Sequence, residues 1–162
     1  MPRLNAVVNH EVYQTYYKRI CECETDRVFC CHQMNHLLDV ARIAYIKNLE
    51  EGLGFDKELI YVAAVLHDIG KFAQEGMSVD SEFINNHRQL YQPYYNGQFT
   101  HEHVLYTAAF IDNIEKLLPR ELNKANWGLK DPFINLAAGH HKPQTEMQWM
   151  IATADRLSSG YD

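Results

Sequence analysis

The chain has 162 residues, of which 46% are hydrophobic and 22% are charged, and its formal net charge is −6. We expect residues 1–162 to form one domain with a buried core, and the acidic balance gives no support for a stand-alone nucleic-acid binder with a basic surface, although a bound metal cluster would add positive charge that this count omits. No apolar run approaches the roughly 20 residues that span a bilayer, and the first residues lack the apolar segment of a secretory signal.

The first helix is predicted over residues 6–21, where polar and apolar residues are mixed. Four cysteines lie close together at the end of this helix and beyond it: Cys21, Cys23, Cys30 and Cys31. Neither pair has the C-x-x-C spacing of a zinc knuckle. Two interpretations stay open, namely buried thiols in a reducing cytosol and a thiolate metal site. The spacing favours the first, from which we predict a cytoplasmic location.

Two helices with strong apolar periodicity are predicted next. Between residues 34 and 53 apolar residues recur at helical spacing, and Gly52 and Gly54 end the segment. Asp56 is suited to cap a helix over residues 57–71.

Residues 73–99 differ from their neighbours because glycine, asparagine and proline are frequent there. We expect a long connection, which in a compact domain is usually functional or flexible. Four aromatic residues are interleaved in it, namely Tyr91, Tyr94, Tyr95 and Phe99. Packing that pins the connection is favoured over stacking on a nucleobase, and both interpretations stay open.

Three more helices are predicted, each with a start signal: residues 100–118 after Thr100, residues 131–141 with Pro132 in the first turn, and residues 145–160 with capping-box spacing of Thr145 and Gln148. No segment alternates convincingly enough to be a strand. The predicted fold class is therefore all-α, either a helical bundle or an orthogonal helix array.

Residues that can bind a metal lie on or beside the apolar stripes of these helices. For example, His36 is in line with Val40 and Ile43. A buried imidazole or carboxylate needs a partner, and any one of them alone is best explained by a hydrogen bond or a salt bridge within the core. The ordered set points instead to metal binding, because imidazole and carboxylate suit divalent ions such as Mn, Fe, Co, Ni and Zn. This set is His36, His67, Asp68, His103, His140, His141 and Asp155.

The order of these residues resembles the motifs of HD-superfamily metal-dependent phosphohydrolases. The run His-Leu-Leu-Asp-Val-Ala-Arg-Ile-Ala from His36 is similar to the first motif, and Leu-His-Asp-Ile-Gly-Lys from Leu66 is similar to the second. His103 with Thr107 and Ala108, the pair His140-His141, and Asp155 resemble the remaining three motifs.

This resemblance implies an HD-like orthogonal helix array with a dinuclear metal site between the central helices. One ion would be held by His36, His67, Asp68 and Asp155, and the other by Asp68, His103, His140 and His141. Two cations would deprotonate a bridging water for attack on phosphorus, and Asp68 would also orient that water. Lys71 would neutralise charge on the phosphate. The alternative for Lys71 is a solvated lysine near a helix end.

Other histidines have weaker patterns. His101 is expected to be an exposed first-turn residue, which would replace His103 if the helix register differed. His32 lies four residues before His36, so we expect it near the site or in solvent, and neither His10 nor His87 has a pattern that recommends it.

The second half of the chain resembles the HD nuclease domain of the large, polymerase-like subunit of type III CRISPR effector complexes. The shared runs are Gln-Phe-Thr-His-Glu-His from Gln98, Ala-Gly-His-His-Lys-Pro from Ala138 and Ala-Asp-Arg-Leu-Ser-Ser-Gly from Ala154. This resemblance implies metal-dependent cleavage of single-stranded DNA, with Mn or Ni as the metal, and other effector-complex subunits as partners. The upstream segment with His36 is instead similar to free-standing bacterial HD hydrolases.

Three hypotheses about function remain open. The first is a nuclease that cleaves single-stranded DNA, and an open groove lined by Lys18, Arg19, Arg88 or Lys142 would favour it. The second is a nucleotide phosphohydrolase, which a closed pocket with a slot for a base would favour. The third is a metal-bound scaffold without catalysis that docks to partner subunits.

Overall fold

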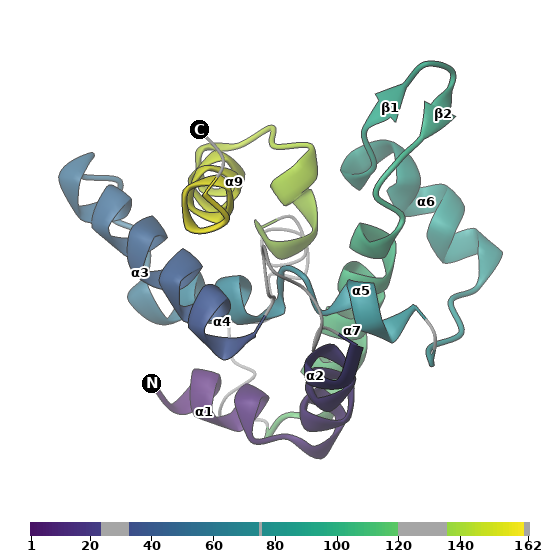
Figure 1. Cartoon of the computed structure of the whole chain (residues 1–162), viewed down its shortest axis with the longest axis horizontal. Helices are drawn as coiled ribbons and strands as arrows, with labels where there is room; N and C mark the ends of the chain where they lie inside the picture. The colour runs from purple at the N-terminus through teal and green to yellow at the C-terminus, as the bar shows by residue number, and fades with distance from the viewer. Residues whose placement is uncertain (24–32, 75, 120–135, 161–162) are drawn as a thin grey trace.

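The computed structural model describes residues 1–23, 33–74, 76–119 and 136–160 (Figure 1). The elements, in chain order, are α1 (Pro2–Val8), α2 (Glu11–Cys23), α3 (Met34–Glu50), α4 (Lys57–Leu66), α5 (Gly70–Ala73), α6 (Ser81–Tyr91), β1 (Tyr94–Tyr95), β2 (Gln98–Phe99), α7 (His103–Leu117), the 3-10 helix η1 (Gly139–His141) and α9 (Glu146–Ser158). The predominance of helices confirms the predicted all-α class.

The helices are arranged around α4 and the turn that follows it. α3 packs against both α4 and α9 on one side, while α5, α6 and α7 form the other side (Figure 1). α1 contacts α4, and α2 contacts α5, so the N-terminal helices close one end of the molecule. Every residue from Val62 to Leu66 is buried, as expected for a helix that is apolar on all sides.

Two predicted helix starts are confirmed by their capping bonds. The Asp56 side chain accepts a hydrogen bond from the Leu59 amide over 2.9 Å at the start of α4. At the start of α9, Thr145 and Gln148 form the predicted capping box. Each bond satisfies amide groups that the first turn of a helix leaves unpaired.

The single helix predicted over residues 6–21 is wrong, because two helices, α1 and α2, occupy this part of the chain. The break lies at Asn9 and His10. His10 Nδ1 accepts a hydrogen bond from the Val12 amide over 3.2 Å, so an imidazole caps the second helix. Histidine is not among the usual capping residues, and the sequence pattern therefore gave no stop signal here.

Residues 73–99 are more ordered than predicted. Asp80 accepts a hydrogen bond from the Phe83 amide and caps α6. Beyond α6 a short antiparallel hairpin pairs Tyr94 with Phe99, so the prediction that no segment forms a strand is wrong at this point. Its turn is Asn96-Gly97, with φ values of 49° and 81°, which is the dipeptide that two-residue hairpin turns favour.

The ends of the other predicted helices also shift. α7 begins at His103 rather than after Thr100, because Thr100 is tied to the hairpin by a 2.9 Å bond from its amide to the Pro93 carbonyl. The start of the helix predicted over residues 131–141 lies outside the described residues. Leu136 to Ala138 are helical, and the chain tightens into η1 after them. Among the described residues, no helix is both long and apolar enough to cross a bilayer.

Candidate metal centre

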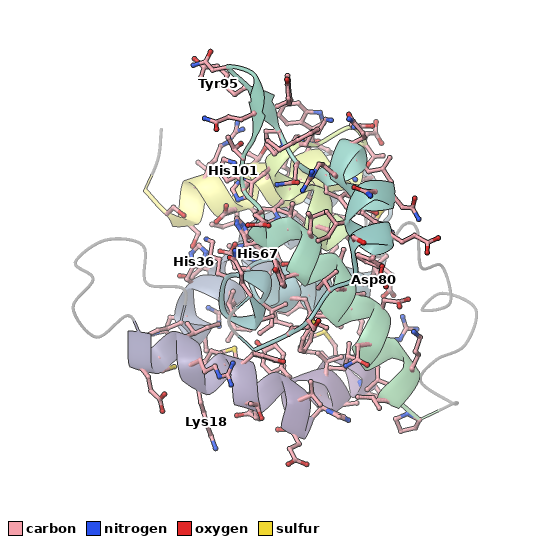
Figure 2. All side chains as sticks on the ribbon, turned by 90° about the vertical axis from the view of Figure 1, so that its right-hand side faces the viewer. Lys18, His36, His67, Asp80, Tyr95 and His101 are labelled. Carbon is pink, nitrogen blue, oxygen red and sulfur yellow. The ribbon has the colours of Figure 1, made fainter. Side chains whose placement is uncertain are left out.

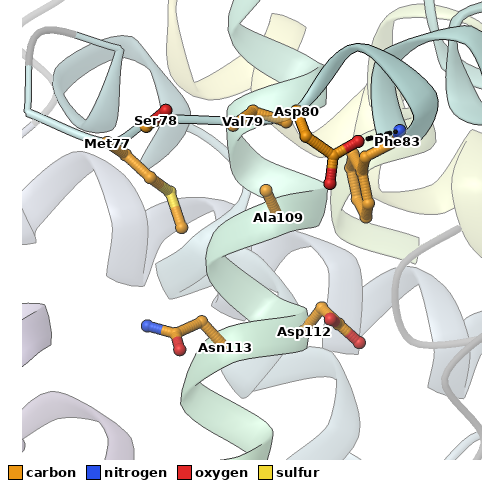
Figure 3. A pocket seen from close by; sticks show the side chains of 8 residues that line it. All are labelled: Met77, Ser78, Val79, Asp80, Phe83, Ala109, Asp112 and Asn113. Atoms are coloured by element: carbon orange, nitrogen blue, oxygen red, sulfur yellow. Dashed lines mark hydrogen bonds between the residues drawn. The ribbon is translucent and has the colours of Figure 1, made fainter.

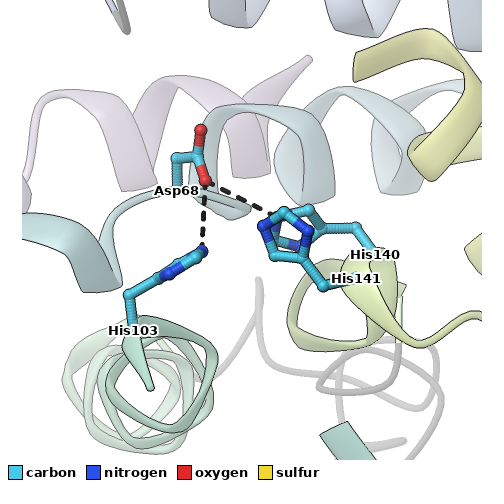
Figure 4. A group of neighbouring side chains, drawn as sticks. All are labelled: Asp68, His103, His140 and His141. Carbon is cyan, nitrogen blue, oxygen red and sulfur yellow. Dashed lines mark ion pairs between the residues drawn. The ribbon is translucent and has the colours of Figure 1, made fainter. Parts of the chain in front are cut away.

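The seven residues predicted to bind metal converge at one place between the helices (Figures 2 and 4). They come from five separate parts of the fold: His36 from α3, the His67-Asp68 pair from the turn between α4 and α5, His103 from the first residue of α7, His140 and His141 from η1, and Asp155 from α9. Their ligand atoms form two groups, and within each group all atoms lie within 4.8 Å of one another. Asp68 belongs to both groups.

The turn that carries His67 and Asp68 replaces the continuous helix predicted over residues 57–71. α4 ends at Leu66 because Thr107 of α7 inserts its hydroxyl into the helical ladder. Thr107 Oγ1 donates to the His67 carbonyl over 3.1 Å and accepts from the Gly70 amide over 3.0 Å. Both groups would otherwise belong to the i to i−4 bonds of a longer helix.

A glycine is required where α5 meets α7. A Cβ at Gly70 would lie 1.9 Å from the His103 carbonyl oxygen and 2.5 Å from the Thr107 amide nitrogen. Both are backbone atoms and cannot move aside cheaply, so only glycine permits this approach. The close contact places the turn directly beside the start of α7, where His103 lies.

The Asp68 carboxylate faces both groups, one oxygen to each, and Figure 4 shows the oxygen that faces His103 and His140. Its Oδ1 lies 3.6 Å from His103 Nε2 and 3.5 Å from His140 Nε2. Its Oδ2 lies 3.2 Å from His67 Nε2, and Lys71 Nζ donates to it over 2.9 Å. The predicted catalytic pair, Asp68 and Lys71, is therefore in direct contact.

The other group is completed by Asp155, which is half-buried on α9. Its Oδ1 lies 3.3 Å from His36 Nε2 and 3.6 Å from His67 Nε2. Metal–ligand bonds of about 2.0–2.2 Å place adjacent ligand atoms roughly 3.0–3.6 Å apart. The spacing of the imidazole and carboxylate atoms in both groups therefore fits ligands arranged around an ion.

Two histidines are oriented by backbone carbonyls. Nδ1 of His67 lies 2.6 Å from the Ala64 carbonyl oxygen, and Nδ1 of His140 lies 2.6 Å from the Ala137 carbonyl oxygen. A carbonyl oxygen only accepts, so Nδ1 carries the proton and donates it. Nε2 of each ring is therefore directed toward the centre, as in known metal-binding histidines whose second nitrogen is hydrogen-bonded.

Several ring nitrogens at the centre are buried without a protein partner. Among the described residues, Nε2 of His67, His103, His140 and His141 has no hydrogen-bond partner. Buried polar atoms in proteins are almost always satisfied, and four such atoms at one place need an explanation. A bound divalent cation would provide it, so the residues present fit a metal site.

Comparison with known proteins agrees with this geometry. The family model described as HD domain matches residues 34–160, which includes every residue of the centre. The chain belongs to the HD domain family. Membership implies a metal-dependent phosphohydrolase.

One curated relative is similar to part of this chain. An uncharacterized protein of Clostridium beijerinckii is 45% identical over 97 residues, an alignment that covers 54% of this chain and 62% of the relative. The match thus spans about three fifths of the relative's own length. The comparison with solved structures gave no match.

Charges in this HD domain favour a cation at the centre. Burial lowers the pKa of His67, but the carboxylates of Asp68 and Asp155 outweigh it and raise the pKa to about 10. Burial raises the pKa of Asp155, yet the neighbouring His36 and His67 outweigh it and hold that pKa below the usual range. The two carboxylates thus attract positive charge, which a proton on His67 supplies in the metal-free protein.

The second group is rich in neutral imidazoles. Burial lowers the pKa of His103 to about 3, and the nearby His140 and Lys71 add to this effect. Burial also lowers the pKa of His141, and the nearby His140, His103 and His101 add to this effect. Both rings are therefore deprotonated at neutral pH, which is the form that binds a metal.

Some residues at the centre were not identified from the sequence pattern. Ser158 Oγ lies 3.0 Å from His36 Nδ1, and Ser159 Oγ donates to Asp155 Oδ1 over 3.4 Å. The only sequence signal for them was the run Ala-Asp-Arg-Leu-Ser-Ser-Gly itself. His101 is exposed as expected, but it lies before α7 rather than in its first turn.

Other sequence predictions concern residues away from the centre. His32 and the side chains of Cys23, Cys30 and Cys31 lie outside the described residues, while Cys21 is a half-buried free thiol. Among the four aromatics, Tyr91 is buried, as packing predicts, whereas Tyr94 and Tyr95 are 63% and 69% exposed.

A hollow of about 360 Å³ lies apart from the metal centre, between the start of α6 and one face of α7 (Figure 3). Its two carboxylates already have partners, since Asp80 caps α6 and Asp112 accepts a hydrogen bond from Lys116. None of the seven residues of the centre lines this hollow.

Proposed function

We propose that this chain is a metal-dependent phosphodiesterase that cleaves single-stranded DNA with two divalent transition-metal ions, such as Mn, Ni, Fe or Co. The observation that carries the proposal is the position of Asp68, whose two oxygens face separate groups of histidines. One ion would be held by His36, His67, Asp68 and Asp155, and the other by Asp68, His103, His140 and His141. A carboxylate shared by two groups of ligands suits the two-metal chemistry used on phosphate esters.

The ions, when bound, polarise the phosphoester and lower the pKa of a water molecule for attack. Asp68 fixes the position of this water by accepting a hydrogen bond at its carboxylate. Lys71, which is already bonded to Asp68 Oδ2, carries its ammonium to the edge of the centre and offsets charge that develops on the phosphate. His67, Asp68 and His140 are buried, and burial strengthens these charge interactions.

The surroundings of the centre support a polynucleotide substrate. Lys142 directly follows His141, and its Nζ donates to the Gln89 carbonyl of α6 over 2.5 Å. Arg88 lies on the same helix, with its guanidinium 5.2 Å from the Phe99 ring of the hairpin. Of the four expected cations, Lys142 thus contacts α6 and Arg88 contacts the hairpin that follows α6, while Lys18 projects from the opposite end of the molecule (Figure 2).

The hairpin adds aromatic surface to these cations. The exposed rings of Tyr94 and Tyr95 extend away from the helices, and Figure 2 places Tyr95 at the far tip. Nucleobases stack on such rings without regard to sequence, and arginine contributes through its planar cation. A single strand has unpaired bases that can use this surface, whereas a duplex does not.

The type III CRISPR resemblance also favours DNA. Its most specific run, Ala154 to Gly160, contains Ser158 and Ser159, which contact His36 and Asp155. These contacts give the run a role in orienting candidate ligands. We propose on this basis that the domain works beside other effector-complex subunits.

A second candidate function is a nucleotide phosphohydrolase of the free-standing HD type. It is favoured by one observation, namely that the match to the HD domain family begins at residue 34 and so includes the motif at His36. That upstream motif is the part of the sequence similar to free-standing bacterial enzymes. The two candidates share one metal centre and differ only in the substrate.

An assay with both substrate classes separates them. The purified chain is stripped of metal, reloaded with Mn, Ni, Co or Mg, and given a labelled single-stranded oligonucleotide, the matching duplex and a panel of nucleotides. We expect cleavage of the single strand with a transition metal and none by Asp68→Asn. Hydrolysis of a nucleotide with the oligonucleotide intact would reject the nuclease, and metal binding without any turnover would support the scaffold.

A further inference from the structure

The backbone of His101 has a conformation that side chains rarely adopt. Its φ is 57°, and among the described residues only Asn96, in the hairpin turn, shares a positive φ without being glycine. Asn96 lies in a hairpin turn where a positive φ is usual, whereas His101 lies between β2 and α7, outside such a turn. A strained residue that persists in a folded protein is a reason to look for a function.

Hydrogen bonds on both sides hold His101 in this conformation. The Thr100 amide donates to the Pro93 carbonyl over 2.9 Å, and the Thr100 carbonyl accepts from Nε2 of the buried Gln92 over 3.1 Å. On the other side, the His101 carbonyl accepts from the Val104 amide over 3.2 Å, at the start of α7. The position of the ring is therefore fixed by the hairpin and by α7 together.

The ring of His101 lies at the entrance to the metal centre. Its centroid is 4.1 Å from that of His141 and 6.0 Å from that of His103. His101 is exposed, while His67 and His140 deeper in the centre are buried. Figure 2 places His101 between the hairpin and His67. His101 belongs to neither group of candidate ligands.

One ring nitrogen of His101 is held and the other remains available. The Thr100 hydroxyl has one proton, and its 2.9 Å contact with His101 Nδ1 is shorter than its 3.4 Å contact with the Pro93 carbonyl. Donation of this proton to Nδ1 leaves the ring proton on Nε2. Within the described part of the chain, Nε2 of His101 has no hydrogen-bond partner.

The same entrance carries a cation. Lys71 belongs to α5, and Gln74, directly after that helix, donates to Glu102, the neighbour of His101, over 3.1 Å. The Lys71 ammonium is bonded to one oxygen of Asp68 over 2.9 Å, and the other oxygen of Asp68 lies 3.6 Å from His103, two residues after His101. An ammonium and an imidazole N–H beside one opening suit a phosphate oxygen.

We propose that His101 is a substrate-positioning residue, which donates a hydrogen bond from Nε2 to a non-bridging oxygen of the phosphoester at the metal centre. This inference rests on the proposed function, and it assigns a role to a histidine outside the seven candidate ligands. The left-handed backbone is what aims the ring across His141 at the entrance. The contact exists both before and during the reaction, so it acts on binding more than on the chemical step.

Two substitutions at position 101 test the role of the side chain without disturbing the fold, because glycine and asparagine tolerate a positive φ. His101→Gly and His101→Asn relieve the strained conformation, and neither places a donor where Nε2 lies. The matched control is Asn96→Gly, which makes the same backbone change at the hairpin turn. We measure thermal stability, bound Mn²⁺, the Kd for inorganic phosphate in the Mn²⁺-loaded protein, and kcat and KM for the oligonucleotide.

The expected result is unchanged or higher thermal stability and unchanged Mn²⁺ content for both His101 variants. The Kd for phosphate should rise about ten- to one-hundred-fold, and kcat/KM should fall by a similar factor, mainly through KM. Asn96→Gly should match the natural chain in all measurements. Loss of Mn²⁺ from the His101 variants would overturn the inference, because His101 would then be a ligand.

The phosphate measurement also separates this inference from the proposed function. If the natural chain binds phosphate but cleaves no DNA, the nuclease proposal fails, and the Kd values alone decide the role of His101. If His101→Gly binds phosphate as tightly as the natural chain, or if the natural chain binds none, the role of His101 is refuted whatever the DNA assay shows.

Discussion

Thr107 donates a hydrogen bond from its hydroxyl to the carbonyl of His67 over 3.1 Å, and this bond joins α7 to the turn that carries the His-Asp pair. The same hydroxyl accepts from the Gly70 amide, so one side chain ends α4 and starts α5. The geometry of the metal centre thus depends on a residue that is not one of its candidate ligands.

Thr107→Val should therefore weaken both folding and metal binding. Valine has the same shape but leaves a buried carbonyl and a buried amide without this partner, at a loss of about 1–3 kcal/mol of unfolding free energy. Chemical denaturation measures the loss, and titration with Mn²⁺ measures the affinity. Thr15→Val is the control, because Thr15 bonds only its own helix and is exposed. Equal stability of the two variants would contradict the role of Thr107.

Gly70→Ala should be more damaging than an ordinary glycine substitution in a helix. The new methyl group would meet the His103 carbonyl at 1.9 Å, so α5 and α7 must separate. We expect a loss of about 3 kcal/mol or more, in the range of severe overpacking, measured by denaturation. In the control, Gly76→Ala, the methyl group meets the end of the flexible Arg19 side chain, which can move. A Gly70→Ala protein as stable as the control would argue against close packing here.

Asp68→Asn and Asp155→Asn should differ in metal content. Asp68 faces both groups of candidate ligands, whereas Asp155 belongs to one. We expect Asp155→Asn to lose about one ion and Asp68→Asn to lose both, with activity below detection for Asp68→Asn. Metal analysis after gel filtration gives the stoichiometry. Two ions retained by Asp68→Asn would reject the shared carboxylate.

The stability of the metal-free protein should be greatest near pH 6.5. Below this pH, the unfolded chain takes up protons that His103, with a folded pKa of about 3, and His141, with a lowered pKa, do not, so stability falls. Above it, the unfolded chain releases the proton that His67 keeps up to a pKa of about 10, so stability falls again.

Denaturation in EDTA across pH 4 to 10 measures this profile. The lowered pKa values of Asp68 and Asp155 add to the acidic decline only below about pH 5, where unfolded aspartates begin to take up protons. His141→Gln should reduce the acidic decline and keep the alkaline one. A stability that rises steadily to pH 9 would contradict the raised pKa of His67.

Removal of the hairpin rings should weaken binding of single-stranded DNA. Tyr94→Ala with Tyr95→Ala should raise KM for the oligonucleotide about ten- to one-hundred-fold, because stacking contributes about 1–3 kcal/mol per base, and should leave kcat nearly unchanged. Fluorescence anisotropy measures the binding. Leu90→Ala, an exposed apolar residue on the neighbouring helix, is the control. An unaltered affinity for DNA would contradict the role of these rings and favour the nucleotide phosphohydrolase.

The candidate centre could be predicted from the sequence more fully than the fold could. The seven side chains lie on or beside the apolar stripes of the predicted helices, and their order resembles known motifs, so no three-dimensional information was needed to group them. The ends of the helices could not be predicted in the same way, because some of them depend on contacts between residues far apart in the sequence. Thr107 ends α4 from a position 40 residues away, and no local signal in residues 57–71 announces this.

Other differences between the predicted and the observed elements arose because the local sequence signals were weak or unusual. The Asn96-Gly97 turn was present in the sequence, but strands of two residues are too short to show alternation. α6 buries only Tyr91 among its residues, so it lacks an apolar stripe, although Asp80 marks its start. His10 as a helix cap lies outside the usual preferences.

His67 and His140 each bond, through Nδ1, to the carbonyl of the residue three positions earlier in the chain. The orientation of both rings is thus fixed by a bond within their own segment of the chain and does not depend on a bound ion. An arriving ion then finds these imidazoles already aligned, and little of its binding free energy is spent on restricting their rotation.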